Sequence, residues 1–170
     1  MGMTPDIFFE QFVQGNYEDY RSNVDCIRRA FNAAVSASQL ADHYLNYYKK
    51  NDPSKLESFS FDNISGFIEY LSINTKDCYR DIRSIATAYK HLYIADIWTI
   101  ASPGVIESIS FPGNKSKIKT IAEEWTKDSD TTEIKSKVVY TRKDGKQIDF
   151  LPTLETVVKF WEKLLYKENQ

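Results

Sequence analysis

The chain has 170 residues with 22 basic and 24 acidic side chains, and its net charge of −2 excludes a protein-wide field that would attract nucleic acid. Hydrophobic residues make up 42% of the chain and aromatic residues 14%, which excludes a mostly disordered protein. This length is enough to bury one core, so we expect residues 1–170 to form a single domain.

The first third of the chain has the periodicity of helices. Residues 5–14 predict a short helix with Pro5 in its first turn. Apolar and small residues then recur at alternating steps of three and four, which predicts one long helix over 17–50. Pro53 ends this helix, because the residue before a proline disfavours helical backbone. The stripe consists of Val24, Ile27, Phe31, Ala34, Ser38, Ala41, Leu45 and Tyr48.

Two shorter helices are predicted next, over residues 62–73 and 76–94. Thr75 stands just before the second of them, where its hydroxyl can act as a cap. The apolar side of the first helix consists of Ile64, Phe67, Ile68 and Leu71. The apolar stripe of the second consists of Cys78, Ile82, Ile85, Tyr89 and Leu92.

The pattern then changes from helical to extended. Residues 95–104 favour neither helix nor strand, whereas 104–150 predict a small antiparallel β-meander. Its last hairpin turns at Asp144–Gly145, a pair that is typical of tight β-hairpins.

An amphipathic helix over 152–168, with Pro152 at its start, is predicted to close the chain. Its inward side consists of Leu154, Val157, Val158, Trp161, Leu164 and Leu165. The expected fold class is therefore α+β and mostly α. We expect an antiparallel helical bundle with a small antiparallel β-meander inserted before the C-terminal helix.

Candidate chemistry concentrates on the helix that precedes the strands. At about 100° per residue, Arg80, Thr87 and His91 lie opposite the apolar stripe. Arg83 and Lys90 lie on the shoulder of the same face. A face of this kind fits a solvated helix surface, and it also fits a binding site for RNA phosphates.

Other catalytic sites are not indicated. The sequence has no glycine-rich phosphate loop, dinucleotide fingerprint or nucleophile elbow. Its two histidines do not form a metal-ligand cluster with the cysteines, so we expect no metal and no cofactor. Cys26 and Cys78 are expected to be reduced thiols on helices. His43 is a second candidate for acid–base work, although its position also fits a partly packed histidine on a helix.

Arg83 and His91 are too far apart to hold one phosphate within a single chain. They stand eight positions apart, which is about 12 Å along a helix axis. Helical side chains also lean toward the N-terminus, so Arg83 points away from His91. In a two-fold dimer with antiparallel helices, Arg83 of one copy could meet His91 of the other. We therefore expect a homodimer if the site is composite.

A helix with Arg, a short spacer and then His inside a helical bundle resembles the HEPN superfamily. The chain is also similar to uncharacterised bacterial proteins whose helix reads Arg-Asp-x-x-Asn-x-x-Lys-His, followed by a β segment and a closing helix. Thr87 stands here where that pattern has Asn, and seven residues rather than four to six separate Arg83 from His91. The remaining matches are Lys90 and the run KFWEKLL at residues 159–165.

The resemblance implies a dimeric RNA-binding protein of a defence or toxin–antitoxin system, which in many members is a metal-independent ribonuclease. Arg83 and His91 would then be catalytic, and Arg80, Thr87 and Lys90 would bind RNA. The alternative is a non-catalytic protein-interaction or regulatory module.

The expected location is the cytoplasm, without contact to a membrane. The N-terminal stretch lacks the basic and apolar pattern of a signal peptide. No apolar run approaches the roughly 20 residues that a membrane-spanning helix needs. RNA, a partner protein or a second copy of the chain are the partners that these observations leave open.

Overall fold

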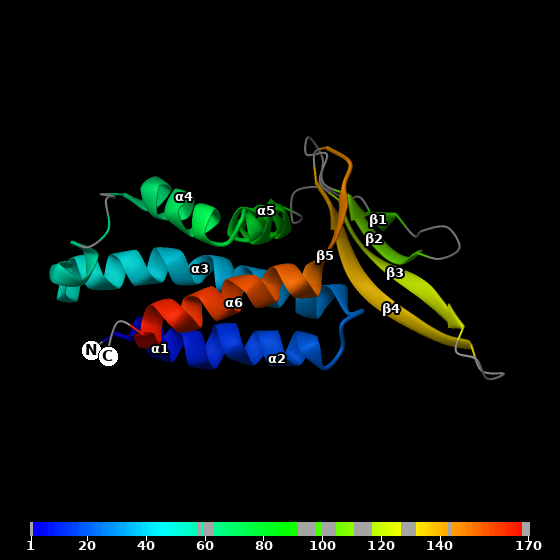
Figure 1. The fold of residues 1–170 in the computed structure, drawn as a ribbon, viewed down its shortest axis with the longest axis horizontal. Helices are drawn as coiled ribbons and strands as arrows, with labels where there is room; N and C mark the ends of the chain where they lie inside the picture. The colour runs from blue at the N-terminus through cyan, green and yellow to red at the C-terminus, as the bar shows by residue number, and fades with distance from the viewer. Residues whose placement is uncertain are drawn as a thin grey trace.

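The computed structural model describes residues 2–57, 59, 63–91, 98–99, 105–110, 117–126, 132–142 and 144–167. Within these ranges, the side chains of 90–91, 98–136 and 167 lie outside the description. Six α-helices lie side by side or end to end in a bundle, and an antiparallel sheet stands at one end of it (Figure 1). The expected α+β, mostly α fold class is confirmed.

The N-terminal helices differ from the prediction at their boundaries. Helices α1 (Pro5–Phe8) and α2 (Gly15–Arg21) are joined by a π-helical segment, η1 (Phe9–Gln14), so one continuous helix replaces the predicted break after residue 14. The long helix α3 spans Ile27–Asn51, and the prediction that it begins at residue 17 is wrong.

The chain leaves the helix between α2 and α3 because the carbonyl of Val24 is held from two sides. The hydroxyl of Tyr20 donates to this oxygen at 2.9 Å, and the backbone N–H of Val138 in the sheet donates to it at 3.0 Å. Ser, Asn and Asp flank Val24 and are turn-forming residues. Val24 continues the apolar spacing of the following helix, so the sequence pattern did not indicate this turn.

Helices α4 (Ile64–Asn74) and α5 (Cys78–His91) follow a short 3₁₀ turn, η2 (Pro53–Leu56). The hydroxyl of Thr75 donates to the carbonyl of Leu71 at 2.7 Å and accepts the N–H of Tyr79 at 3.0 Å. Thr75 thereby satisfies backbone groups at the end of α4 and the start of α5, as a cap does. Residues 92–94 of the predicted fourth helix, Leu92 included, lie outside the described residues.

The five strands pair in chain order, each antiparallel to the next. Their bounds are β1 Trp98–Thr99, β2 Val105–Ser110, β3 Lys117–Thr126, β4 Thr132–Thr141 and β5 Gln147–Asp149. Gly145 has φ +88°, a left-handed conformation that favours glycine, so the predicted hairpin turn is confirmed. Figure 1 shows β3 and β4 extending away from the helices.

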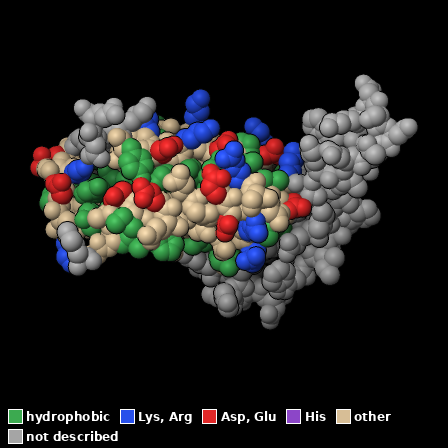
Figure 2. Space-filling model, turned by 90° about the horizontal axis from the view of Figure 1, so that it is seen from below, with side chains coloured by type: hydrophobic (Ala, Val, Ile, Leu, Met, Phe, Trp, Pro, Cys, Tyr) green, Lys and Arg blue, Asp and Glu red, His purple; other side chains and the backbone are tan. Residues whose placement is uncertain are grey.

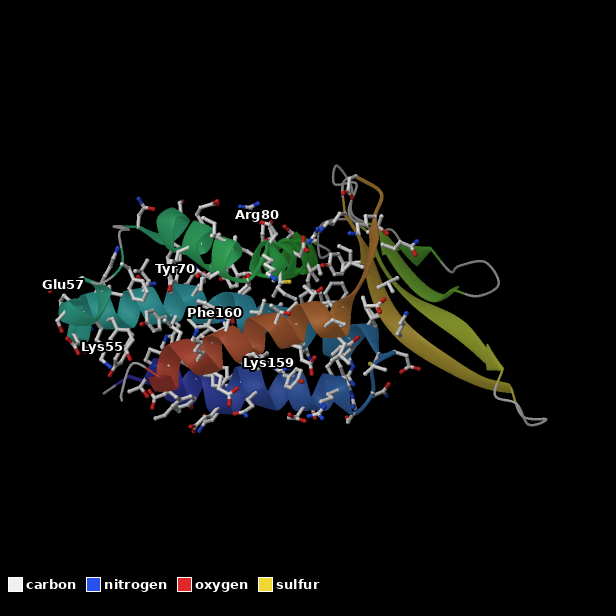
Figure 3. All side chains as sticks on the ribbon, in the orientation of Figure 1. Lys55, Glu57, Tyr70, Arg80, Lys159 and Phe160 are labelled. Carbon is white, nitrogen blue, oxygen red and sulfur yellow. The ribbon has the colours of Figure 1, made fainter. Side chains whose placement is uncertain are left out.

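Helix α6 (Phe150–Lys167) begins directly after β5, two residues before the predicted start. Pro152 fits into its first turn, because the first N–H groups of a helix have no intrahelical acceptor. The six residues predicted to point inward are all buried: Leu154, Val157, Val158, Trp161, Leu164 and Leu165. In Figure 3 the rings of Tyr70 of α4 and Phe160 of α6 lie near one another, and their centroids are 6.1 Å apart.

A polar cluster joins the sheet to the bundle. The carboxylate of Asp81 on α5 accepts hydrogen bonds from the Arg142 guanidinium and, at 2.6 Å, from the Tyr140 hydroxyl. Tyr140 also bonds the hydroxyl of Thr153 on α6 at 3.1 Å. This cluster fixes the turn end of the β4–β5 hairpin against two helices, and the sequence patterns did not indicate it.

Candidate functional site

Arg80 lies on the exposed side of α5, and two carboxylates hold its guanidinium. Its Nη2 is 2.9 Å from Oε2 of Glu69 on α4, and its Nη1 is 2.8 Å from Oδ1 of Asp77. Figure 3 shows Arg80 at the outer side of the helical layer, away from α6. The single positive charge of the guanidinium thus faces two carboxylates within the chain, so Arg80 is poorly placed to attract an external phosphate.

Arg83 is less tightly held. Its Nη1 is 3.5 Å from Oδ2 of Asp42 on α3, and the exposed fractions of the two side chains are 33% and 51%. An ion pair as exposed as this one contributes about 0–1 kcal/mol to stability. An external anion can therefore replace Asp42 at small cost.

A buried tyrosine lies beneath this pair. The hydroxyl of Tyr79 donates to the carbonyl of Ser38 on α3 at 3.0 Å. Burial raises the pKa of Tyr79 far above its ordinary value, and the positive charge of Arg83 opposes that rise. Tyr79 consequently stays a neutral donor that anchors α5 to α3 and keeps Arg83 beside Asp42.

The other predicted site residues of α5 are Thr87, Lys90 and His91. Thr87 is exposed on α5, as the helical spacing predicts. The hydroxyl of Ser84, next to Arg83, donates to the carbonyl of Arg80 within the helix at 2.8 Å. Lys90 and His91 belong to α5 by their backbone, but their side chains lie outside the described residues. The roles of all these residues stay predictions.

His43 faces the N-terminal helix instead of α5. Its ring centroid lies 5.0 Å from that of Phe8 and 6.2 Å from that of Tyr47. Its Nε2 atom is buried, and in the described part of the chain it has no hydrogen-bond partner. His43 and Asp42 are adjacent in sequence, yet they point to different neighbouring helices, so His43 does not join Arg83.

The described residues contain no group of three or more His, Cys, Asp or Glu that could hold a metal ion. Cys26 and Cys78 are free and partly buried, and burial raises the pKa of the Cys78 thiol. Within the same ranges, no helix is long and apolar enough to cross a membrane. The face in Figure 2 carries acidic and basic side chains next to one another, with hydrophobic groups between them.

No protein-family model matches the chain, and no curated protein or solved structure is similar enough to count as a relative. The likeness to HEPN proteins therefore depends on the residues of α5 and α6 quoted above.

Proposed function

We propose that this protein is a HEPN-like RNA-binding protein that contacts RNA through the exposed face of α5. The observation that carries the proposal is the loose, exposed pair of Arg83 and Asp42. A planar guanidinium matches two phosphate oxygens, and here it is free to exchange one carboxylate for them. Arg80 is bound by two carboxylates, so its contribution to RNA binding is expected to be smaller.

Binding should be tested by fluorescence anisotropy with a short single-stranded RNA at low salt. Arg83→Ala is expected to weaken binding about 10- to 100-fold, because it removes a charge-assisted hydrogen bond to phosphate. Asp42→Asn should strengthen binding, since it removes the competing carboxylate. Arg80→Ala, a matched substitution one turn away on the same helix, should have a smaller effect than Arg83→Ala. Equal losses for both arginine variants would contradict the assignment.

Cleavage is the extended form of this proposal and requires two copies of the chain. Without a metal, the RNA's own 2′-hydroxyl would attack the phosphorus as a base takes its proton, and the bond to the leaving 5′-oxygen would break as an acid protonates that oxygen. Arg83 would stabilise the developing charge on the phosphate, and His91 of the other copy would make one of these two proton transfers. A dimer of twice 19.7 kDa, about 39 kDa, should then appear in sedimentation. Cleavage should persist in EDTA and leave cyclic 2′,3′-phosphate ends.

His91→Ala should reduce the cleavage rate about 10²- to 10⁴-fold, the usual effect of losing a general acid or base. A monomeric protein that still cleaves RNA would rule out the composite site. Binding without cleavage in the wild-type protein would leave an RNA-binding protein that is not an enzyme.

A non-catalytic interaction module is the second candidate. The observation in its favour is that each described arginine of the α5 face has a carboxylate partner, so this part of the surface is close to neutral. A wild-type protein that fails to bind RNA even at low salt would favour this candidate.

A further inference from the structure

A hollow of about 270 Å³ opens between the N-terminal helix and α3, and Tyr89 of α5 also lines it. Pockets that hold drug-sized ligands begin at about 300 Å³, so this one suits a smaller, single-ring or double-ring group. None of its lining residues carries a charge, which disfavours a phosphate or another ion as the occupant.

Aromatic rings form one side of the hollow. The centroids of Phe8 and Phe12 are 5.1 Å apart, and 43% of Phe12 remains exposed. Tyr89 is stacked on Phe31 with a centroid distance of 4.7 Å, which holds the tyrosine ring in place. An exposed ring beside a preformed wall is the arrangement on which an unstacked base of single-stranded RNA can stack.

Three side-chain amides supply the polar part of the lining: Asn16 of α2 and Asn32 and Gln39 of α3. Asn32 and Gln39 are exposed and Asn16 is partly buried, so all three amides are accessible to a ligand in the hollow. An amide both donates and accepts, and this combination pairs with the edges of bases. Neutral amides beside aromatic rings therefore match a base better than they match an aliphatic chain or a charged group.

The hollow lies close to the proposed phosphate contact. Gln39 stands three residues before Asp42 on α3, so their side chains are neighbours on one helix face, about 4.5 Å apart along the axis. Asp42 in turn pairs with Arg83. The hollow and Arg83 are therefore near enough on the surface to contact neighbouring parts of one RNA strand.

We propose that this hollow binds one unstacked base of single-stranded RNA while Arg83 holds a neighbouring phosphate. The proposal rests on the RNA-binding function proposed above and names single-stranded RNA as the substrate class. Phe12 provides the stacking surface, and Gln39 contacts the edge of the base.

The test compares two probes: a fluorescent single-stranded RNA and a strand of the same length and backbone without bases. Wild type should bind the RNA about 5- to 100-fold more tightly than the abasic strand, the range expected for stacking one base. Phe12→Ala and Gln39→Ala should reduce this preference and leave the affinity for the abasic strand unchanged. Arg83→Ala should weaken binding of both strands.

Ile73→Ala is the matched control, because Ile73 is another exposed apolar residue, at 67%, on α4. It should leave the preference for bases unchanged. Circular dichroism should be used to check that each variant is folded. If Phe12→Ala does not fold, Gln39→Ala still tests the base subsite.

Equal binding of both strands by wild type would overturn the base subsite and leave the RNA-binding function intact. An unaltered preference in both Phe12→Ala and Gln39→Ala would have the same meaning. Failure of wild type to bind either strand would reject the function and the subsite together, and would favour a protein partner for the hollow.

Discussion

The ring of Trp161 on α6 packs against aromatic rings from three other helices. Its side chain has no exposed surface, and its ring centroid lies 5.8 Å from Tyr44 of α3, 5.9 Å from Phe67 of α4 and 6.5 Å from Tyr79 of α5. Trp161→Ala should lower the free energy of unfolding by about 3–5 kcal/mol, because the surrounding rings cannot close so large a cavity. Urea denaturation measures this loss.

Phe160→Ala is the neighbouring control on α6. Phe160 is only partly buried, so its removal should cost clearly less than that of Trp161. Trp161→Phe should also cost less than alanine, since the buried Nε1 of Trp161 has no hydrogen-bond partner among the described residues. Similar losses for Phe160→Ala and Trp161→Ala would show that the core is not centred on Trp161.

At the scale of elements, an ion pair with neutral hydrogen bonds around it is one of the contacts that attach the sheet to the bundle. The Asp81 side chain is 14% exposed and that of Arg142 is 33% exposed. Arg142→Ala should destabilise the protein by about 2–4 kcal/mol, because it leaves a largely buried carboxylate without its counter-charge. Arg142→Lys should restore part of this loss, since an ammonium supplies the counter-charge but cannot reproduce the two-pronged contact.

Thermal unfolding measures this effect, and Arg21→Ala serves as the control. Arg21 pairs with Glu18 on the surface at 3.5 Å, with exposed fractions of 59% and 56%. Its removal should change the unfolding free energy by about 0.5 kcal/mol or less. An Arg142→Ala loss as small as that of Arg21→Ala would mean that the sheet does not depend on this cluster.

For the whole molecule, buried tyrosines predict alkaline unfolding. Burial raises the pKa values of Tyr20, Tyr79 and Tyr140 far above 10, and burial together with a carboxylate neighbour raises those of Tyr17 and Tyr166 to about 12. The folded state therefore keeps these hydroxyls neutral while the unfolded chain ionises them near pH 10. Stability is complete below about pH 10 and falls as pH rises toward the folded-state values.

Tyr20, Tyr79 and Tyr140 are buried, and each should lower the free energy of unfolding by about 1.4 kcal/mol per pH unit in that window. Tyr166 is 39% exposed and should contribute less, because solvent screens its ionised form. Urea denaturation at several pH values between 8 and 12 would measure the slope, with tyrosinate absorbance followed in parallel. Tyr79→Phe should make the slope shallower by one tyrosine's share. Constant stability through pH 11, with tyrosinate already formed, would show that the tyrosines are accessible to solvent.

The elements themselves could be predicted because their signals are local. The inward positions of α6 and the turn at Gly145 follow from spacing and residue type within a few neighbours along the chain. On α5 the helical spacing also placed Thr87 outward and Arg83 at the edge of the buried side, and their exposures agree with it. Periodicity decides which side of a helix is apolar, and the core then covers that side.

The partners of the candidate site came only with the tertiary structure. Asp42 is 41 residues from Arg83, and Arg142 is 61 residues from Asp81, so no local pattern relates them. The break before α3 is likewise stabilised by a hydrogen bond from Val138 in the distant sheet. Helix packing places two carboxylates beside Arg80 and one more distant carboxylate beside Arg83. Helical spacing gives the direction of a side chain but not the charge that it meets, because that charge belongs to another element of the fold.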